Sequence, residues 1–197
     1  MNKSNNDPRE ESLSETSKTG IFYKVDIVVI GAGQAGLSAA YFLKKDGIEA
    51  GTGFVVLDDE LGPGGAWQHR WNSLTLNNVN GINDLPGMGF SEAVNKDDKE
   101  LQANVAIPEY YEKYEKTFEL PVIRPIRVSE VIERNGRFLI RTNGVQFSAR
   151  GIINATGTWK TPHCPEYPGW QKFKGKQLHT GEYTNADEFI GKHVIVV

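Results

Sequence analysis

Three glycines in the pattern G-x-G-x-x-G (Gly31, Gly33 and Gly36) directly follow an apolar run at residues 25–30 that is rich in β-branched side chains. This arrangement suits a pyrophosphate. Gly31 allows a tight turn, the missing side chain of Gly33 lets a phosphate approach the backbone, and Gly36 allows a helix to pack closely on a strand. A helical pattern at residues 34–45 starts at once, so unpaired N–H groups and the positive end of the helix dipole face the same point. The pattern therefore predicts a dinucleotide site.

A carboxylate follows the second predicted strand. Residues 54–57 form a short apolar run, and Asp58 and Asp59 come directly after it. An acid at this place in a βαβ unit binds the ribose hydroxyls of a dinucleotide. Asp58 is preferred because it follows the strand at once, whereas Asp59 is interpreted as a solvated loop acid. The alternative is a glycine turn without a ligand, but the strand, helix and acid together favour the dinucleotide site.

Short strands are predicted in the second half of the chain. Alternating runs between residues 126 and 149 are separated by Asn-Gly pairs at 135–136 and 143–144, which are the strongest short signal for β-hairpins. The apolar run 151–155 follows. We expect it to lie beside residues 25–30 as a neighbouring parallel strand.

One further helix is predicted over residues 108–118, with Pro108 in its first turn and a stripe of aromatic side chains in the core. The predicted fold class is α/β: a Rossmann-like, three-layer domain with a parallel sheet and a small β-meander.

Composition narrows the class of protein. The chain has 197 residues, a net charge of −3 and a pI near 5.8, which argues against a nucleic-acid partner. No apolar run approaches the ~20 residues of a membrane span, and no signal peptide is visible, so a cytoplasmic protein is expected. Residues 1–20 are polar and are predicted to be a disordered tail. Cys164 is the single cysteine, so the chain has neither a disulfide nor a CxxC pair. The scattered histidines suggest no metal site.

Three further segments carry recognisable motifs: Gly-Gly-Ala-Trp at residues 64–67, Ala-Thr-Gly at residues 155–157, and an aromatic-, Gly- and His-containing segment at residues 173–183. Together with the glycine pattern, these segments resemble the class B flavin-dependent monooxygenases, a family that includes flavin-containing, Baeyer–Villiger and YUCCA-type enzymes. Residues 64–67 fit its Gly-Gly-x-Trp segment, and residues 155–157 fit the Ala-Thr-Gly segment between its two nucleotide domains. Residues 173–183 fit the fingerprint FxGxxxHxxx followed by an aromatic. Tyr183 stands where Baeyer–Villiger enzymes usually have Trp, which tilts the subclass toward heteroatom or YUCCA-like oxygenation.

The resemblance implies a flavoprotein with two dinucleotide-binding domains, incomplete in this chain. Residues 1–20 would be the tail, and residues 21–170 the FAD-binding domain, including the β-meander 126–149. Residues 171–197 would be a linker and the first strand of a truncated NADPH-binding domain. In the family, the strand that matches residues 194–197 runs into a second glycine-rich motif.

The resemblance also implies a set of site residues. Asn78 would be a catalytic or orienting residue near the flavin ring. Three of the expected cofactor contacts have a structural alternative: Trp67 could be a core residue, Arg70 a surface charge, and Thr156 a cap at the end of a strand. The expected FAD-binding residues are Gly31, Gly33, Gln34, Ala35, Gly36, Asp58, Gly65, Trp67, Arg70, Thr156 and Gly157.

The function implied is that of an FAD-dependent, NADPH-using monooxygenase that acts on a small organic substrate with O2. The chain would be an N-terminal fragment that is inactive alone. Two alternatives stay open: a flavin-dependent NAD(P)H reductase without oxygenation, and a non-enzymatic FAD-binding remnant. No membrane partner is expected, and the sequence makes no prediction of oligomeric state.

Overall fold

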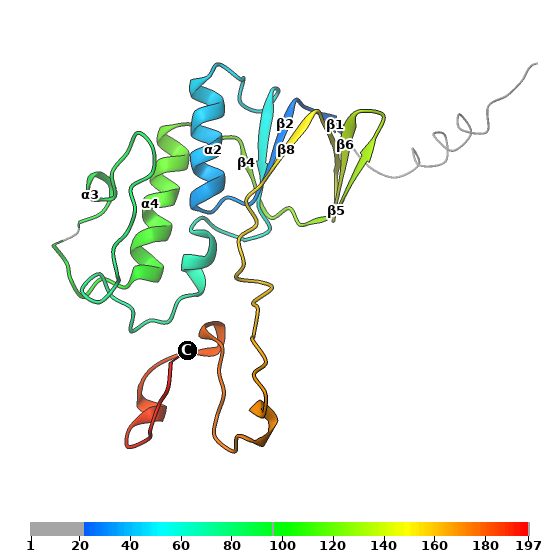
Figure 1. The fold of residues 1–197 in the computed structure, drawn as a ribbon. Coiled ribbons are helices and arrows are strands. Elements are labelled where there is room, and N and C mark those ends of the chain that lie inside the picture. Colours follow the sequence, from blue (N-terminus) through cyan, green and yellow to red (C-terminus); the bar gives the residue numbers. More distant parts are fainter. Residues whose placement is uncertain (1–21, 96, 197) are drawn as a thin grey trace, which may run out of the picture.

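The computed structural model describes residues 22–95 and 97–196 (Figure 1). The predicted tail at 1–20 lies outside the described residues. The helices and strands, in chain order, are β1 (Phe22–Lys24), β2 (Ile27–Ile30), α2 (Gln34–Lys45), β3 (Phe54–Leu57), η1 (Gly65–His69), α3 (Phe90–Ala93), α4 (Ala103–Thr117), β4 (Val122–Ile123), β5 (Val128–Arg134), β6 (Arg137–Thr142), β7 (Gln146–Ala149), β8 (Gly151–Asn154), η2 (Trp170–Lys172), η3 (Thr180–Glu182) and η4 (Asp187–Phe189).

A parallel four-stranded sheet with the order β4-β3-β2-β8 is the centre of the domain. Ile27 of β2 lies opposite Phe54 on one side and Gly151 on the other. The prediction that residues 25–30 and 151–155 form neighbouring parallel strands is therefore confirmed. The strand order reverses at β2, since β3 is added on one side of it and β8 on the other.

Alternate side chains of the central strands fill two separate cores, which gives the domain three layers. Val29 and Val56 pack with the side chains of α2 and α4, which cover one face of the sheet (Figure 1). Val28 and Val55 point the other way and pack against the meander. A strand buried on both faces needs a continuous run of apolar residues, as β2 and β3 have. The α/β fold class with a parallel sheet is confirmed.

The predicted meander is also present, as the antiparallel strands β5, β6 and β7. Asn135 and Gly136 both have positive φ (53° and 72°), as a two-residue hairpin turn of the type favoured by Asn-Gly requires. Two strands were not predicted. β1 pairs in parallel with β7 and forms the edge of this second sheet, and β4 pairs with β3 at the edge of the central sheet. Strands of three and two residues carry too short a pattern for sequence analysis to identify.

The predicted start of the second long helix is wrong. The helix α4 begins at Ala103, so Pro108 lies inside it rather than in its first turn. The buried face already includes Ala103, Ala106 and Ile107, whose spacing is helical. Pro108 costs the helix one hydrogen bond. Its ring packs on Gly64, where an added Cβ would lie 2.7 Å from the proline Cγ. The predicted aromatic stripe of Tyr111, Tyr114 and Phe118 does lie in the core: Tyr111 and Tyr114 are buried, and the half-buried Phe118 packs against the same cluster.

The described residues at the end of the chain do not form the predicted strand. Residues 193–196 have no regular secondary structure, and the side chains of Ile195 and Val196 are almost fully exposed. A β-strand needs a hydrogen-bonding neighbour, and no strand of the described residues lies beside this segment. The division at residue 170 stays a prediction.

None of the helices in the described part of the chain has the length and apolar character that crossing a bilayer requires.

Candidate functional site

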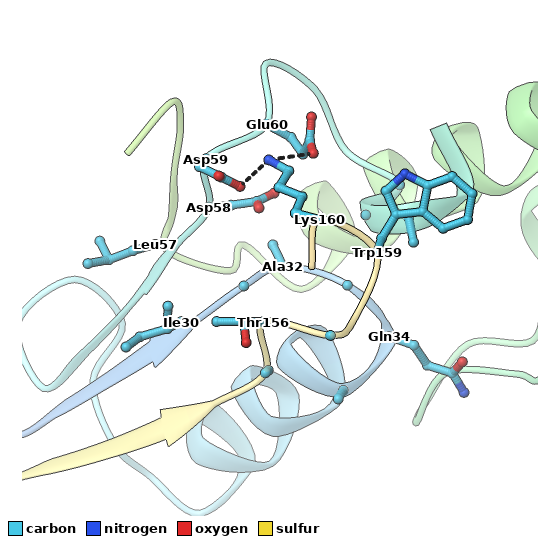
Figure 2. Close-up of a pocket in the computed structure, with 18 of the residues that line it drawn as sticks. Ile30, Ala32, Gln34, Leu57, Asp58, Asp59, Glu60, Thr156, Trp159 and Lys160 are labelled. Carbon is cyan, nitrogen blue, oxygen red and sulfur yellow. Dashed lines mark ion pairs between the residues drawn. The ribbon is translucent and has the colours of Figure 1, made fainter. Parts of the chain in front are cut away.

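A cavity of about 640 Å³ opens at the carboxyl ends of the parallel strands, where the strand order reverses (Figure 2). Such a reversal is where open α/β sheets bind their ligands. The cavity walls come from the loops that follow β2, β3 and β8 and from η1, and Tyr111 of α4 and residues 126–128 complete them. The sequence-predicted residues that line it are Gly31, Gly33, Gln34, Ala35, Asp58, Gly65, Trp67, Thr156 and Gly157.

Two glycines of the G-x-G-x-x-G pattern, Gly31 in the loop after β2 and Gly36 in the first turn of α2, are required by the protein's own backbone. Gly31 has a φ of +101°, and an added Cβ would lie 2.4 Å from the carbonyl oxygen of Ala155. A Cβ on Gly36 would lie only 1.8 Å from the carbonyl oxygen of Gly31. Gly36 therefore lies behind the cavity and holds α2 close to the loop.

Gly33 is different, because an added Cβ there would meet nothing within 4 Å. It lines the cavity, so the space in front of it is open to a ligand. Gly65 of η1 faces it, and a Cβ on Gly65 would lie 3.0 Å from the Gly33 Cα. The two glycines form a narrow cradle in which a ligand can touch the backbone.

The N-terminus of α2 opens into this cradle. Gly33 is its N-cap, no side chain caps the helix, and no acidic residue lies in its first turn. The first N–H groups of a helix have no partner within the helix, and the helix dipole adds positive potential there. Because no side chain caps these groups, a phosphate of a ligand can accept their hydrogen bonds.

Asp58, at the end of β3, is the most buried acid of the cavity wall, with 6% of its surface exposed. Its Oδ2 accepts a hydrogen bond of 2.8 Å from Nε of Arg124. The other two nitrogens of Arg124 each donate to a carboxylate oxygen of Glu115, at 2.7 Å. Burial works against the charge of Arg124, but the two carboxylates outweigh it, so the pKa of Arg124 is raised.

Asp59 and Glu60 are joined by a lysine that sequence analysis missed. Lys160, from the loop after β8, lies 2.7 Å from Asp59 and 2.9 Å from Glu60, and Figure 2 shows it crossing toward the acids. His69 also contacts Glu60, at 2.9 Å. Asp59 is therefore an ion-pair partner rather than only a solvated acid. The signal that could have found Lys160 is its place just beyond the Ala-Thr-Gly segment, at the same sheet edge as the acids.

Lys160→Gln is expected to make the stability of the protein less dependent on pH in the acid range. Burial alone would raise the pKa of Glu60, but Lys160 and His69 lower it below its ordinary value of 4.5. The resulting stabilisation is present above that pH and is lost as the pH falls through the folded-state pKa. The measurement is the free energy of unfolding in urea at about pH 7 and about pH 3.5.

The control for this measurement is Lys116→Gln, which removes an exposed ion pair with Glu112 on α4. It should change the acid dependence much less. An equal change in the two variants would show that Lys160 does not govern the ionisation of Glu60.

Three predicted site residues do not line the cavity: Gly36, which lies behind it, Arg70 and Asn78. Arg70 lies among three indole rings, with its guanidinium carbon 4.6 Å from the ring centre of Trp159 and 5.6 Å and 5.9 Å from those of Trp67 and Trp71. Burial lowers the pKa of Arg70. Asn78 is exposed, and its amide accepts from the Thr75 N–H and donates to the Ser73 carbonyl within its own loop.

This fold and its glycine cradle define a dinucleotide-binding domain, and comparison with known proteins agrees. The model of the pyridine nucleotide-disulphide oxidoreductase family matches residues 28–197. The chain belongs to this family of oxidoreductases.

Individual relatives are more specific. A solved flavin-containing monooxygenase from Stenotrophomonas maltophilia is 41% identical, with a TM-score of 0.72, over 86% of this chain and 49% of that one. The uncharacterized oxidoreductase CzcO of Bacillus subtilis is 32% identical over 87% of this chain and 48% of its own length. The indole-3-pyruvate monooxygenase YUCCA1 of Oryza sativa is 31% identical over 86% of this chain and 41% of its length. The resemblance to flavin monooxygenases is confirmed, and the chain spans about half the length of these relatives.

Proposed function

We propose that this chain binds FAD in the cavity at the edge of the parallel sheet, as the flavin-binding part of an NADPH-dependent monooxygenase. The observation that carries the proposal is the cradle of Gly33 and Gly65 at the uncapped N-terminus of α2. Its backbone groups suit a pyrophosphate, and its glycines leave no side chain in the way. We infer the identity of the cofactor as a flavin, and the monooxygenase class, from the names of the relatives.

The proposed roles follow the cavity wall. The N–H groups at the start of α2 hold the pyrophosphate. Asp58 binds the ribose hydroxyls of the adenosine half. The loop of Thr156 and Gly157 passes along the other side of the cofactor, with Gly157 at a φ of +64°. Trp67 covers the end nearer the flavin.

When bound, FAD supplies the redox chemistry, with NADPH as the reductant and O2 as the co-substrate that oxygenates a small organic molecule. The residues of this chain bind and orient the cofactor and keep water from one of its sides. The NADPH site is proposed to lie in sequence that these residues do not include, so this chain alone is expected to bind FAD without turnover.

The test is a titration of the 197-residue chain with FAD, followed by flavin fluorescence and by the absorbance of the protein after removal of free cofactor. A yellow protein with one FAD per chain supports the proposal. A colourless protein that binds NADH more tightly than FAD would contradict it. NADPH oxidation in the presence of O2, measured on the same sample, tests the proposal that the chain does not turn over alone.

A further inference from the structure

We propose that Arg124 is a positioning residue for ribose recognition, which holds Asp58 so that one carboxylate oxygen faces the cavity. The inference rests on the proposed binding of FAD. It names a residue that the glycine pattern and the resemblance did not identify, and it assigns to that residue a measurable effect on ligand preference.

The hydrogen bonds of the guanidinium are divided unequally between two acids. Glu115, on α4, takes two of the three nitrogens in a paired arrangement, whereas Asp58 receives only the Nε bond. Such a paired contact fixes the plane of the guanidinium. Arg124 is therefore anchored to α4, and its Nε presents a fixed donor to Asp58.

The backbone of Asp58, from which the acceptor carboxylate projects, is also held in place. Its backbone N–H donates to the carbonyl of Ile123, and its carbonyl accepts from the N–H of Ile126. Only Oδ2 of its side chain is bound by another side chain of the described residues. Asp58 lines the cavity, so Oδ1 is the oxygen left to a ligand.

The charges of this cluster do not cancel. Two carboxylates surround one guanidinium, and 7% to 13% of each side chain is exposed. A buried cluster with an excess negative charge is unfavourable unless hydrogen-bond donors complete it. The neighbouring acids Asp59 and Glu60 are already joined to Lys160. A pair of hydroxyl donors on the cavity side, as in the adenosine ribose of FAD, would supply the hydrogen bonds that the Asp58 carboxylate lacks.

The experiment compares two ligands on the full 197-residue chain: FAD and an FAD analogue that lacks the 2′-hydroxyl of the adenosine ribose. The wild-type protein should bind FAD about tenfold more tightly, because one hydrogen bond to a charged group is lost with the analogue. In Arg124→Gln the preference should fall to about twofold or less, since Asp58 is no longer oriented. Arg124→Lys keeps the charge and loses the planar fork, so it should lose the same preference. It therefore serves as the second test if the glutamine variant fails to fold.

Arg141→Gln is the matched control, because it removes an ion pair between exposed side chains (Arg141 and Glu130) in the meander. It should keep the wild-type preference. Weaker binding of both ligands by an equal factor in the Arg124 variants would assign Arg124 a purely structural role and overturn the inference. A wild-type protein that binds both ligands equally would overturn it and leave FAD binding intact. A wild-type protein that binds neither would remove the proposed function itself.

Discussion

Gly33→Val is expected to abolish FAD binding and to leave the fold intact. The side chain would project into open space, since no atom outside the adjacent residues of the chain lies within 4 Å of the added Cβ. That space is where the pyrophosphate would lie against the start of α2. Losing about two charge-assisted hydrogen bonds to backbone N–H groups would weaken binding on the order of 100-fold or more.

The measurement is a fluorescence titration with FAD, together with urea unfolding of the free protein. The stability should change by no more than about 1 kcal/mol, because Gly33 is only the N-cap of α2 and carries no capping side chain. A Gly33→Val protein that binds FAD as tightly as the wild type would place the cofactor elsewhere.

Gly36→Ala should have the opposite profile, with a large loss of stability. In an exposed helix, alanine is favoured over glycine by about 1 kcal/mol. Here the new Cβ would lie 1.8 Å from the carbonyl oxygen of Gly31, a backbone atom that cannot rotate away. The helix must move from the sheet, and the cost of overpacking exceeds the gain in propensity. We expect a net loss of about 2 kcal/mol or more.

Urea unfolding without ligand measures this effect, and Ala35→Ser, which changes the neighbouring position on the cavity side, is the comparison variant. Wild-type stability in Gly36→Ala would show that the contact between α2 and the loop is looser than the structure has it. Together, the variants at positions 33 and 36 separate the space that the ligand needs from the space that the fold needs.

The sequence predicts best what depends on local pattern. The strands β2, β3 and β8, the helix α2 and the Asn-Gly turns all follow from short stretches of chain, and their placement was confirmed. The predicted start of α4 was wrong because Pro108 was interpreted as a residue of the first helical turn. The helical spacing of Ala103, Ala106 and Ile107 was the better signal.

Pairs that form only in the folded chain could not be predicted. The contacts of Arg124 with Asp58 and of Lys160 with Asp59 and Glu60 join residues far apart in sequence. No periodicity encodes them. The same is true of Arg70, whose place among the indole rings depends on Trp159 from the loop after β8. The cavity roles of Arg70 and Asn78 stay predictions, and neither side chain lines the cavity in this structure.

The pairing of β2 with β8 also has a consequence for the order of folding. Ile27 pairs with Gly151, so this pairing closes a long loop of chain that contains α4 and the meander. Long loops carry an entropic cost, and contacts of high sequence separation form late. The glycine loop after β2 gains its neighbour Ala155 only with this last pairing. We therefore expect β8 to acquire protection from hydrogen exchange after β2 and β3 during refolding, so that the ligand cavity is completed at the end of the reaction.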